Sequence, residues 1–227
     1  MTVERTVLLS LLKLTQKGPI SKSLVSKDAR VPVQVADDML EKISGEGLVQ
    51  LKGKTVEASL YQRVKIAIRA IRLGADFERA CRALRWDEFE NITATAFLAN
   101  NFTVTKRFRF KHAGRRWEID VIGFKEPIVA CVDCKHWCHG WGKSASMKAV
   151  EAQIQRTEAL ARVLPAHQEL GLTNWRKATL IPGILSLVPA PLKFYRNTPI
   201  VPILQLQNFL NELPAHVNAL KNFLVNL

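Results

Sequence analysis

The sequence predicts a two-domain α/β protein, in which a small helical domain with one hairpin precedes a mixed sheet flanked by helices. Three observations lead to this prediction. Apolar residues recur at helical spacing in the first part of the chain, strand-like runs dominate from about residue 102 to 137, and a long helical segment separates these runs from two further ones. A chain of 227 residues, 48% of them hydrophobic, is long enough for such a pair of domains.

The first sixty residues show a pattern of three helices and a hairpin. Helices are expected over 3–17, over 21–29 and over a third segment that Gly45 and Gly47 terminate. Apolar and polar residues then alternate on both sides of the turn 52–54, as in a small hairpin. Together these elements resemble a winged helix-turn-helix module.

The role of this module stays open between two alternatives. In winged helices the third helix usually enters the DNA major groove and the hairpin touches the backbone. Here the third helix carries Asp37, Asp38 and Glu41 beside Lys42, which is a poor surface for meeting phosphates. We therefore weigh DNA binding equally with protein docking or dimerisation.

The domain boundaries follow from the elements after the hairpin. A basic amphipathic helix over 60–73 is expected to begin a connection, Asp76 to cap the next helix, and a further helix to start near Asp87. The predicted divisions are a winged-helix domain over 1–60, a helical linker over 61–85, and a second domain over 86–227.

The second domain begins with a helix and continues with three consecutive strands. These strands are expected within 102–114, 115–127 and 127–137. A long helix over about 146–163 follows, and then come two strands and a C-terminal helix. The expected segments are 179–188 and 199–206 for the strands, and a helix from about Asn208.

Acidic and basic residues stand at particular places in this series of elements. Asp120 lies on the second strand, Asp133-Cys134-Lys135 lies on the third, and Phe89-Glu90 lies on the helix before the sheet. Over about residues 86–205 the chain resembles the PD-(D/E)XK nuclease superfamily, which has the restriction-endonuclease-like fold. Glu90 resembles the helix-borne glutamate of Mrr-type restriction enzymes and archaeal Holliday-junction resolvases. Ile119 stands where the nominal motif has proline.

The resemblance implies a metal-dependent DNA endonuclease of the restriction, repair or junction type. Asp133 and Lys135 share one face of their strand, roughly 6.6 Å apart, and leave room for one metal ion and one phosphate. Mg²⁺ or Mn²⁺ would be bound by Asp120, Asp133, Glu90 and the backbone carbonyl of Cys134, because hard cations prefer oxygen ligands. The expected catalytic residues are Asp120, Asp133, Lys135 and Glu90, with Lys135 orienting water or offsetting phosphate charge.

A zinc site is the rival interpretation of the same stretch, because five potential ligands fall within nine positions. Strand alternation argues against it. Cys131 faces the same way as Asp133, whereas Cys134 and the following histidine face the other way, so these side chains cannot meet at one tetrahedral ion. The residues concerned are Cys131, Cys134, His136, Cys138 and His139.

The basic composition favours a polyanionic partner, since 33 Lys and Arg against 20 Asp and Glu give a formal charge of +13. Alternation on the first strand places Phe108 and Phe110 in the core, and Arg107, Arg109 and Lys111 on the opposite face. That face is either a phosphate track or an edge strand protected by charge. The residues expected to bind DNA are Lys106, Arg107, Arg109, Lys111, Arg115, Arg116 and Lys143.

Several residues near the motif are assigned secondary roles. Gln153 or Gln155, on the helix after the third strand, is expected to be an auxiliary polar residue of the site. Glu118 either assists Asp120 or forms a solvent-facing salt bridge. Trp137 and Trp141 are expected to shape the substrate groove.

The remaining expectations concern partners and location. A homodimer is expected because duplex cleavage needs two sites. No membrane segment is expected, since prolines interrupt the longest apolar region, and a cytoplasmic protein with free thiols is expected. The alternative function is a non-catalytic DNA-binding or regulatory protein whose nuclease-like domain only holds DNA.

Overall fold

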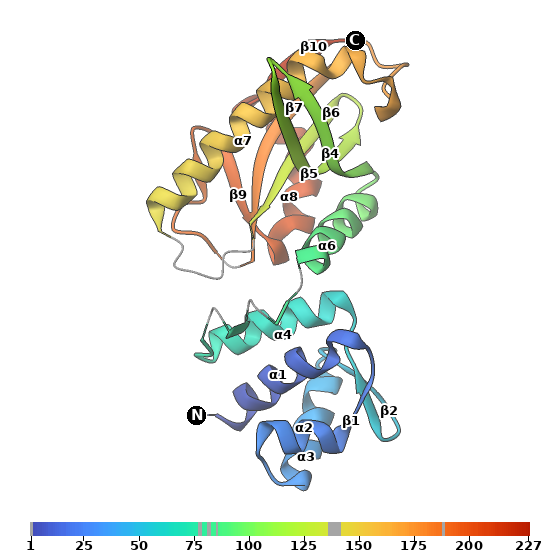
Figure 1. Cartoon of the computed structure of the whole chain (residues 1–227), viewed down its shortest axis with the longest axis vertical. Helices are drawn as coiled ribbons and strands as arrows, with labels where there is room; N and C mark the ends of the chain where they lie inside the picture. Colours follow the sequence, from blue (N-terminus) through green and yellow to red (C-terminus); the bar gives the residue numbers. More distant parts are fainter. Residues whose placement is uncertain (1, 77–78, 81–82, 85, 136–141, 188) are drawn as a thin grey trace. The chain divides into compact units, whose positions relative to one another are not determined.

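The computed structural model describes residues 2–227 except 77–78, 81–82, 85, 136–141 and 188. The chain forms two compact units, Met1–Phe89 and Glu90–Leu227 (Figure 1). The predicted class is confirmed: a small helical unit with a hairpin precedes a large mixed sheet flanked by helices. Within the described residues, no helix combines the length and the apolar character needed to cross a bilayer.

Between Val3 and Arg72, the first unit contains four α-helices and a three-stranded sheet in the order β1-β3-β2. The expected helices and hairpin are present, and a two-residue strand, too short for periodicity to indicate, pairs with the hairpin. The elements are α1 (Val3–Leu14), β1 (Ile20–Ser21), α2 (Lys22–Ala29), α3 (Val33–Gly45), β2 (Gln50–Lys52), β3 (Thr55–Glu57) and α4 (Leu60–Arg72).

Helix α4 belongs to the core of this unit and does not extend away from it as a linker. Ser59 and Gln62 form a reciprocal capping box at its start, and its face with Val64 and Ala67 is fully buried. Further along, the carboxylate of Asp76 accepts a hydrogen bond of 2.7 Å from the Arg79 amide, as the predicted cap requires. Helix α4 therefore lies in the first unit, which extends to Phe89, whereas the sequence suggested a linker over 61–85.

A buried arginine fastens α4 to its surroundings in the first unit. The guanidinium of Arg63 donates to the Leu12 carbonyl, the Thr15 hydroxyl and the Ala83 carbonyl at 2.7 to 2.8 Å. It also pairs with the buried carboxylate of Glu88 at 2.7 Å. Because the burial of a charge is costly unless it is paired and hydrogen-bonded, this complete set of partners explains how Arg63 can be 1% exposed.

The second unit contains a seven-stranded sheet of order β4-β5-β6-β7-β9-β8, with β10 beside β7. The strands β4, β5 and β6 are antiparallel, whereas β6, β7 and β9 are parallel. The elements are α6 (Trp86–Ala99), β4 (Thr103–His112), β5 (Arg115–Lys125), β6 (Ile128–Lys135), α7 (Lys143–Val163), β7 (Lys177–Ser186), β8 (Phe194–Tyr195), β9 (Thr198–Pro202), α8 (Leu206–His216) and β10 (Phe223–Asn226).

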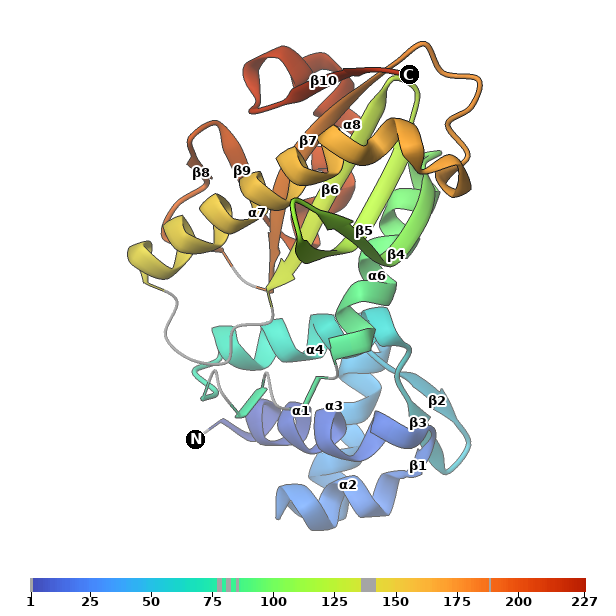
Figure 2. The same ribbon diagram turned by 45° about the horizontal axis from the view of Figure 1, so that its top comes forward.

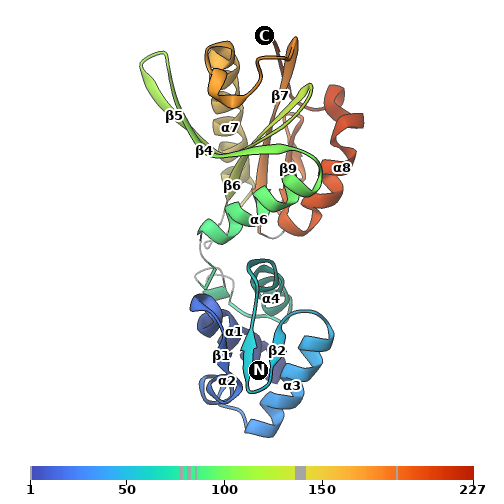
Figure 3. The same cartoon turned by 90° about the vertical axis from the view of Figure 1, so that its right-hand side faces the viewer.

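Helices cover both faces of this sheet. Helix α7 lies on one face, and α6 and α8 lie on the other (Figures 2 and 3). Helix α6 packs very closely on β5: a Cβ added to Gly123 would lie 2.2 Å from a ring carbon of Phe97. The far end of the β4–β5 hairpin extends beyond the rest of the sheet (Figure 3).

Several differences from the predicted elements concern the C-terminal half. Helix α7 begins at Lys143, three residues before the expected start. The second of the late strands ends at Pro202, and a 3₁₀ turn over Ile203–Gln205 replaces its second half. Strand β10 was not predicted, because four residues with only two partly buried apolar side chains carry little periodic signal.

Candidate active site

Asp120 and Asp133 face each other where two neighbouring strands separate. The antiparallel β5–β6 ladder ends with the pair Val121 and Val132, so the two aspartates are the next opposed pair. Opposed residues of antiparallel strands point to the same face of the sheet. The Cys134 amide donates to Asp120 Oδ2 at 2.8 Å, so the carboxylate takes a backbone N–H just beyond the end of the ladder.

The Asp133 carboxylate lies between two cationic side chains. Its Oδ1 accepts a hydrogen bond of 2.9 Å from Arg156 Nη1 on α7. Its Oδ2 is shielded from solvent and lies 2.8 Å from Lys135 Nζ, in an ion pair without hydrogen-bond alignment. Asp133 is only 4% exposed, which is rare for a charged residue and requires such partners. Lys135 lies beside Asp133, as the strand period predicted.

Glu90 of α6 joins the cluster from the helix before the sheet. Its carboxylate pairs with Arg107 Nε on β4 at 2.8 Å, and Glu90 itself is 3% exposed. In the β4–β5 register, Arg107 lies between the residues that pair with Val121 and Ile119, the two neighbours of Asp120. Glu90, Asp120, Asp133 and Lys135 therefore all contribute to one electrostatic cluster, although they come from three different elements.

The backbone conformation at Arg107 differs from the regular strand that was expected for β4. Its φ of 52° lies in the left-handed region, which is uncommon for a residue other than glycine. This twist directs both Lys106 and Arg107 toward α6, where Lys106 Nζ meets Asn91 Oδ1 at 2.7 Å. The prediction that Arg107 shares one basic face with Arg109 and Lys111 is therefore wrong. The predicted burial of Phe108 and Phe110 is confirmed.

The surroundings of Asp120 disfavour its charged form. Burial, and next the negative charge of Asp133, raise the pKa of Asp120 to about 6; Glu90 adds to this effect, and the Cys134 amide and Lys135 oppose it. Burial also raises the pKa of the Cys134 thiol well above its usual value, helped by Asp120. Asp120 is therefore protonated more readily than an ordinary aspartate, and a bound cation would relieve its repulsion with Asp133.

The donor chemistry of the cluster suits a hard divalent cation. Asp120, Asp133 and Glu90 offer carboxylate oxygens, and Asp133 Oδ2 is buried without a hydrogen bond. However, the described residues contain no group of three His, Cys, Asp or Glu side chains already arranged around one ion position. In this conformation the Asp133 and Glu90 carboxylates are paired with arginines, so cation binding requires these pairs to rearrange.

The cysteines of β6 point in opposite directions, as the argument against zinc required. Cys131 packs in the core beneath α7, whereas Cys134 lies 3.7 Å from the Thr93 hydroxyl of α6. Both thiols are free and buried. The other three potential zinc ligands and the two tryptophans expected to shape the groove lie outside the described residues: His136, Cys138, His139, Trp137 and Trp141.

On α7 the structure separates the two auxiliary candidates and adds a residue that sequence reasoning missed. Gln153 is fully buried and donates from Nε2 to the Cys131 carbonyl at 2.8 Å, while Gln155 is exposed. Arg156 contacts both Gln153 Oε1, at 3.4 Å, and Asp133. Its position three residues after Gln153, on the same helix face, is the signal that would have identified it.

The expected DNA-binding residues surround the cluster and the projecting hairpin. Arg109 pairs with Glu118 at 2.7 Å across the hairpin, which supports the salt-bridge interpretation of Glu118. Arg115 stacks over the Trp117 ring at 4.0 Å. Lys143 is exposed at the first turn of α7. Arg109 and Glu118 also line a hollow at the hairpin together with Phe110, Lys111, Arg116 and Trp117.

Charge is segregated on the surface of the first unit. The Lys22 amide donates to the Lys54 carbonyl at 3.0 Å, which joins the start of α2 to the tip of the β2–β3 hairpin. The exposed face of α3, in contrast, presents Val33, Asp38 and Glu41. Within the described residues, four basic side chains on the α2 and hairpin side form no ion pair: Lys22, Lys27, Arg30 and Lys54.

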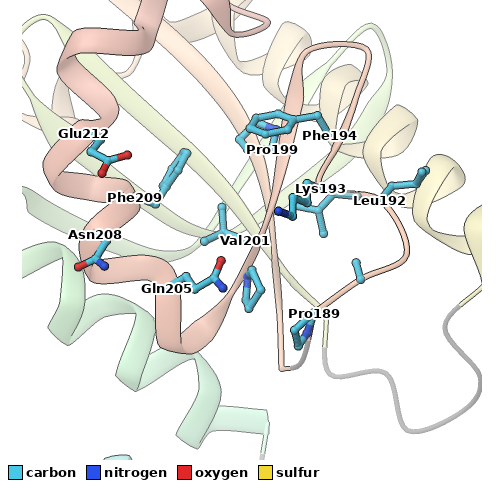
Figure 4. A pocket seen from close by; sticks show the side chains of 13 residues that line it. Pro189, Leu192, Lys193, Phe194, Pro199, Val201, Gln205, Asn208, Phe209 and Glu212 are labelled. Atoms are coloured by element: carbon cyan, nitrogen blue, oxygen red, sulfur yellow. The ribbon is translucent and has the colours of Figure 1, made fainter.

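A further hollow of about 290 Å³ lies between α8 and the segment around β8 and β9 (Figure 4). Its walls are largely apolar, with Phe194 and Phe209 on opposite sides, and its charged lining residues are Lys193 and Glu212. No member of the carboxylate cluster lines it. This hollow is therefore separate from the carboxylate cluster.

Comparison with known proteins identifies a relative but no activity. No family model matches the chain. Protein VC1899 from Vibrio cholerae aligns with 95% of this chain at 12% identity and a TM-score of 0.38, and the chain spans only 51% of that protein. An uncharacterized protein of Archaeoglobus fulgidus is 32% identical over 130 residues, which are 57% of this chain and 92% of the archaeal protein. The chain therefore belongs to one family with this uncharacterized archaeal protein.

Proposed function

We propose that the second unit is a metal-dependent nuclease that hydrolyses phosphodiester bonds in DNA. The observation that carries the proposal is the opposition of Asp120 and Asp133 just beyond the end of the β5–β6 ladder, with Lys135 2.8 Å from the second carboxylate. Two acids and one lysine in this arrangement fit the PD-(D/E)XK pattern, and Glu90 supplies the helix-borne acid.

Each side chain has a role that its surroundings support. Mg²⁺ or Mn²⁺, when held by Asp120, Asp133, Glu90 and the Cys134 carbonyl, would polarise the scissile phosphate and acidify a water molecule. The Lys135 side chain retains 25% exposure, so its ammonium group can reach a phosphate oxygen or an attacking water from beside Asp133. There it would stabilise the charge that develops on the phosphate.

Basic side chains on both units would hold the DNA backbone. In the second unit these are the seven residues named from the sequence, with the projecting hairpin contributing Arg115 and Arg116. In the first unit the α2 and hairpin surface, with Lys22 and Lys54, fits phosphates better than the acidic and apolar face of α3 does. Contacts of this kind position DNA without reading its sequence. Cleavage of both strands would require two active sites and therefore two copies of the chain.

The test is a cleavage assay with matched variants. Linear, supercoiled, branched and single-stranded DNA are incubated with Mg²⁺, Mn²⁺ or EDTA, using the wild type, Asp133→Asn and Lys135→Met. We expect cation-dependent cleavage that falls by about 10²-fold or more in each variant. Glu158→Gln, an exposed change on α7, is the control and should cleave as the wild type does. Full activity in Asp133→Asn and Lys135→Met would refute the assignment.

A second candidate function is a DNA-binding protein without catalysis. It is favoured by the absence, among the described residues, of three ligands already arranged around an ion. This candidate predicts DNA binding that is insensitive to EDTA, and no cleavage of any substrate by the wild type. The same assay therefore separates the two functions, because only the nuclease yields cation-dependent products.

A further inference from the structure

Two cationic protein side chains neutralise the Asp133 carboxylate. Arg156 donates to one carboxylate oxygen at 2.9 Å, and Lys135 lies 2.8 Å from the other. Both cationic side chains keep about a quarter of their surface exposed, at 27% and 25%. The carboxylate is thus buried, while its partners have a path to solvent.

Arg156 is held in this position by a relay that begins on the strand itself. Gln153 Nε2 donates to the Cys131 carbonyl of β6, and this bond turns Gln153 Oε1 toward Arg156 Nη1. Gln153 is 0% exposed, so its orientation is set by the protein and not by water. The relay connects the backbone two residues before Asp133 to the guanidinium that contacts its side chain.

A divalent cation at Asp133 would face a permanent positive charge. The guanidinium group carries a full positive charge close to the carboxylate that the cation would use. Two charges on an ion and one on the guanidinium, at about 5 Å, repel by an amount worth roughly tenfold in affinity even at a water-like dielectric constant. The ion and Arg156 therefore compete for the same carboxylate.

We infer that Arg156 is a positioning residue that neutralises Asp133 in the cation-free protein and must withdraw when a cation binds. The inference rests on the proposed function, since it takes Asp133 as a cation ligand.

The test measures cation affinity directly, by titration calorimetry of full-length protein with Mn²⁺ and no DNA. Arg156→Gln should bind Mn²⁺ roughly tenfold more tightly than the wild type, whereas Arg156→Lys, which keeps the charge, should stay within about threefold. Arg162→Gln on the same helix is the control, because Arg162 is 69% exposed and pairs only with Glu158 among the described residues. Equal or weaker binding by folded Arg156→Gln would overturn the inference.

If Arg156 had a purely structural role, Arg156→Gln would bind Mn²⁺ more weakly than the wild type, because Asp133 would lose its support. Should Arg156→Gln fail to fold, wild-type protein still provides a test. The guanidinium NMR signal of Arg156 should show slow rotation without cation and lose that restraint on adding Mg²⁺; an unchanged signal at saturation refutes the inference. Asp133→Asn should lose cation binding. If it binds as the wild type does, the proposed function itself fails.

Discussion

Asn in place of Asp120 should stabilise the protein at neutral pH. The Asp120 pKa of about 6 in the folded protein exceeds the ordinary value of 3.8, because the carboxyl is buried beside Asp133. A carboxyl with a raised pKa binds protons more tightly in the folded state, so stability falls as pH rises from about 4 to about 6. Asparagine cannot ionise, yet its carbonyl oxygen can still accept the hydrogen bond from the Cys134 amide.

The size of the effect follows from the shift in pKa. A shift of about two units corresponds to about 3 kcal/mol above pH 7 and to less than about 1 kcal/mol at pH 4. For a domain of this size, 3 kcal/mol is worth about 6–12 °C in Tm. The gain should appear in the second unit, which contains Asp120.

Thermal and urea unfolding of wild type and Asp120→Asn, in EDTA at pH 8 and pH 4, measures this effect. Asp120→Ala is the comparison that removes both the charge and the hydrogen-bond acceptor, so it should gain less than the asparagine variant. The electrostatic reasoning fails if Asp120→Asn is less stable than the wild type at pH 8, or if its advantage is the same at both pH values.

Three further predictions concern other parts of the molecule. Glu88→Ala should destabilise the first unit by about 3–5 kcal/mol in urea unfolding, because it leaves the buried Arg63 charge unpaired; a loss below 1 kcal/mol would contradict this. Lys22→Glu with Lys54→Glu should lower DNA affinity about tenfold and reduce the salt slope by about 2 in fluorescence anisotropy, and an unchanged slope would exclude that surface. Gly123→Ala should lower the free energy of unfolding by at least about 1–3 kcal/mol, because the new methyl group would lie 2.2 Å from a ring carbon of Phe97 on α6. A urea midpoint equal to that of the wild type would refute the close packing.

Regular periodicity made much of the fold predictable from sequence. Alternation along β4 predicted that Phe108 and Phe110 enter the core, and alternation along β6 predicted that Asp133 and Lys135 share a side. These results follow from the covalent geometry of a strand, which fixes the direction of successive side chains. The same rule separated Cys131 from Cys134.

Features that depend on contacts distant in the chain were not predictable in this way. The left-handed backbone of Arg107 breaks the alternation that its neighbours obey, and no local pattern in the sequence indicates it. Arg156 meets Asp133 only because α7 packs back on β6, 23 positions away along the chain. Strand β10 forms because it pairs with β7, and its four residues are too few for a strand pattern to be recognised in the sequence.

The hydrogen bond from the Cys134 amide to Asp120 makes one backbone proton a reporter for the whole cluster. At 2.8 Å from a carboxylate oxygen, this amide should resonate far downfield in a proton–nitrogen spectrum, since charge-assisted hydrogen bonds deshield the donor. Protonation of Asp120 or capture of its oxygen by an ion would move that single resonance. The site can thus be followed in solution in ¹⁵N-labelled protein, without substrate or mutation.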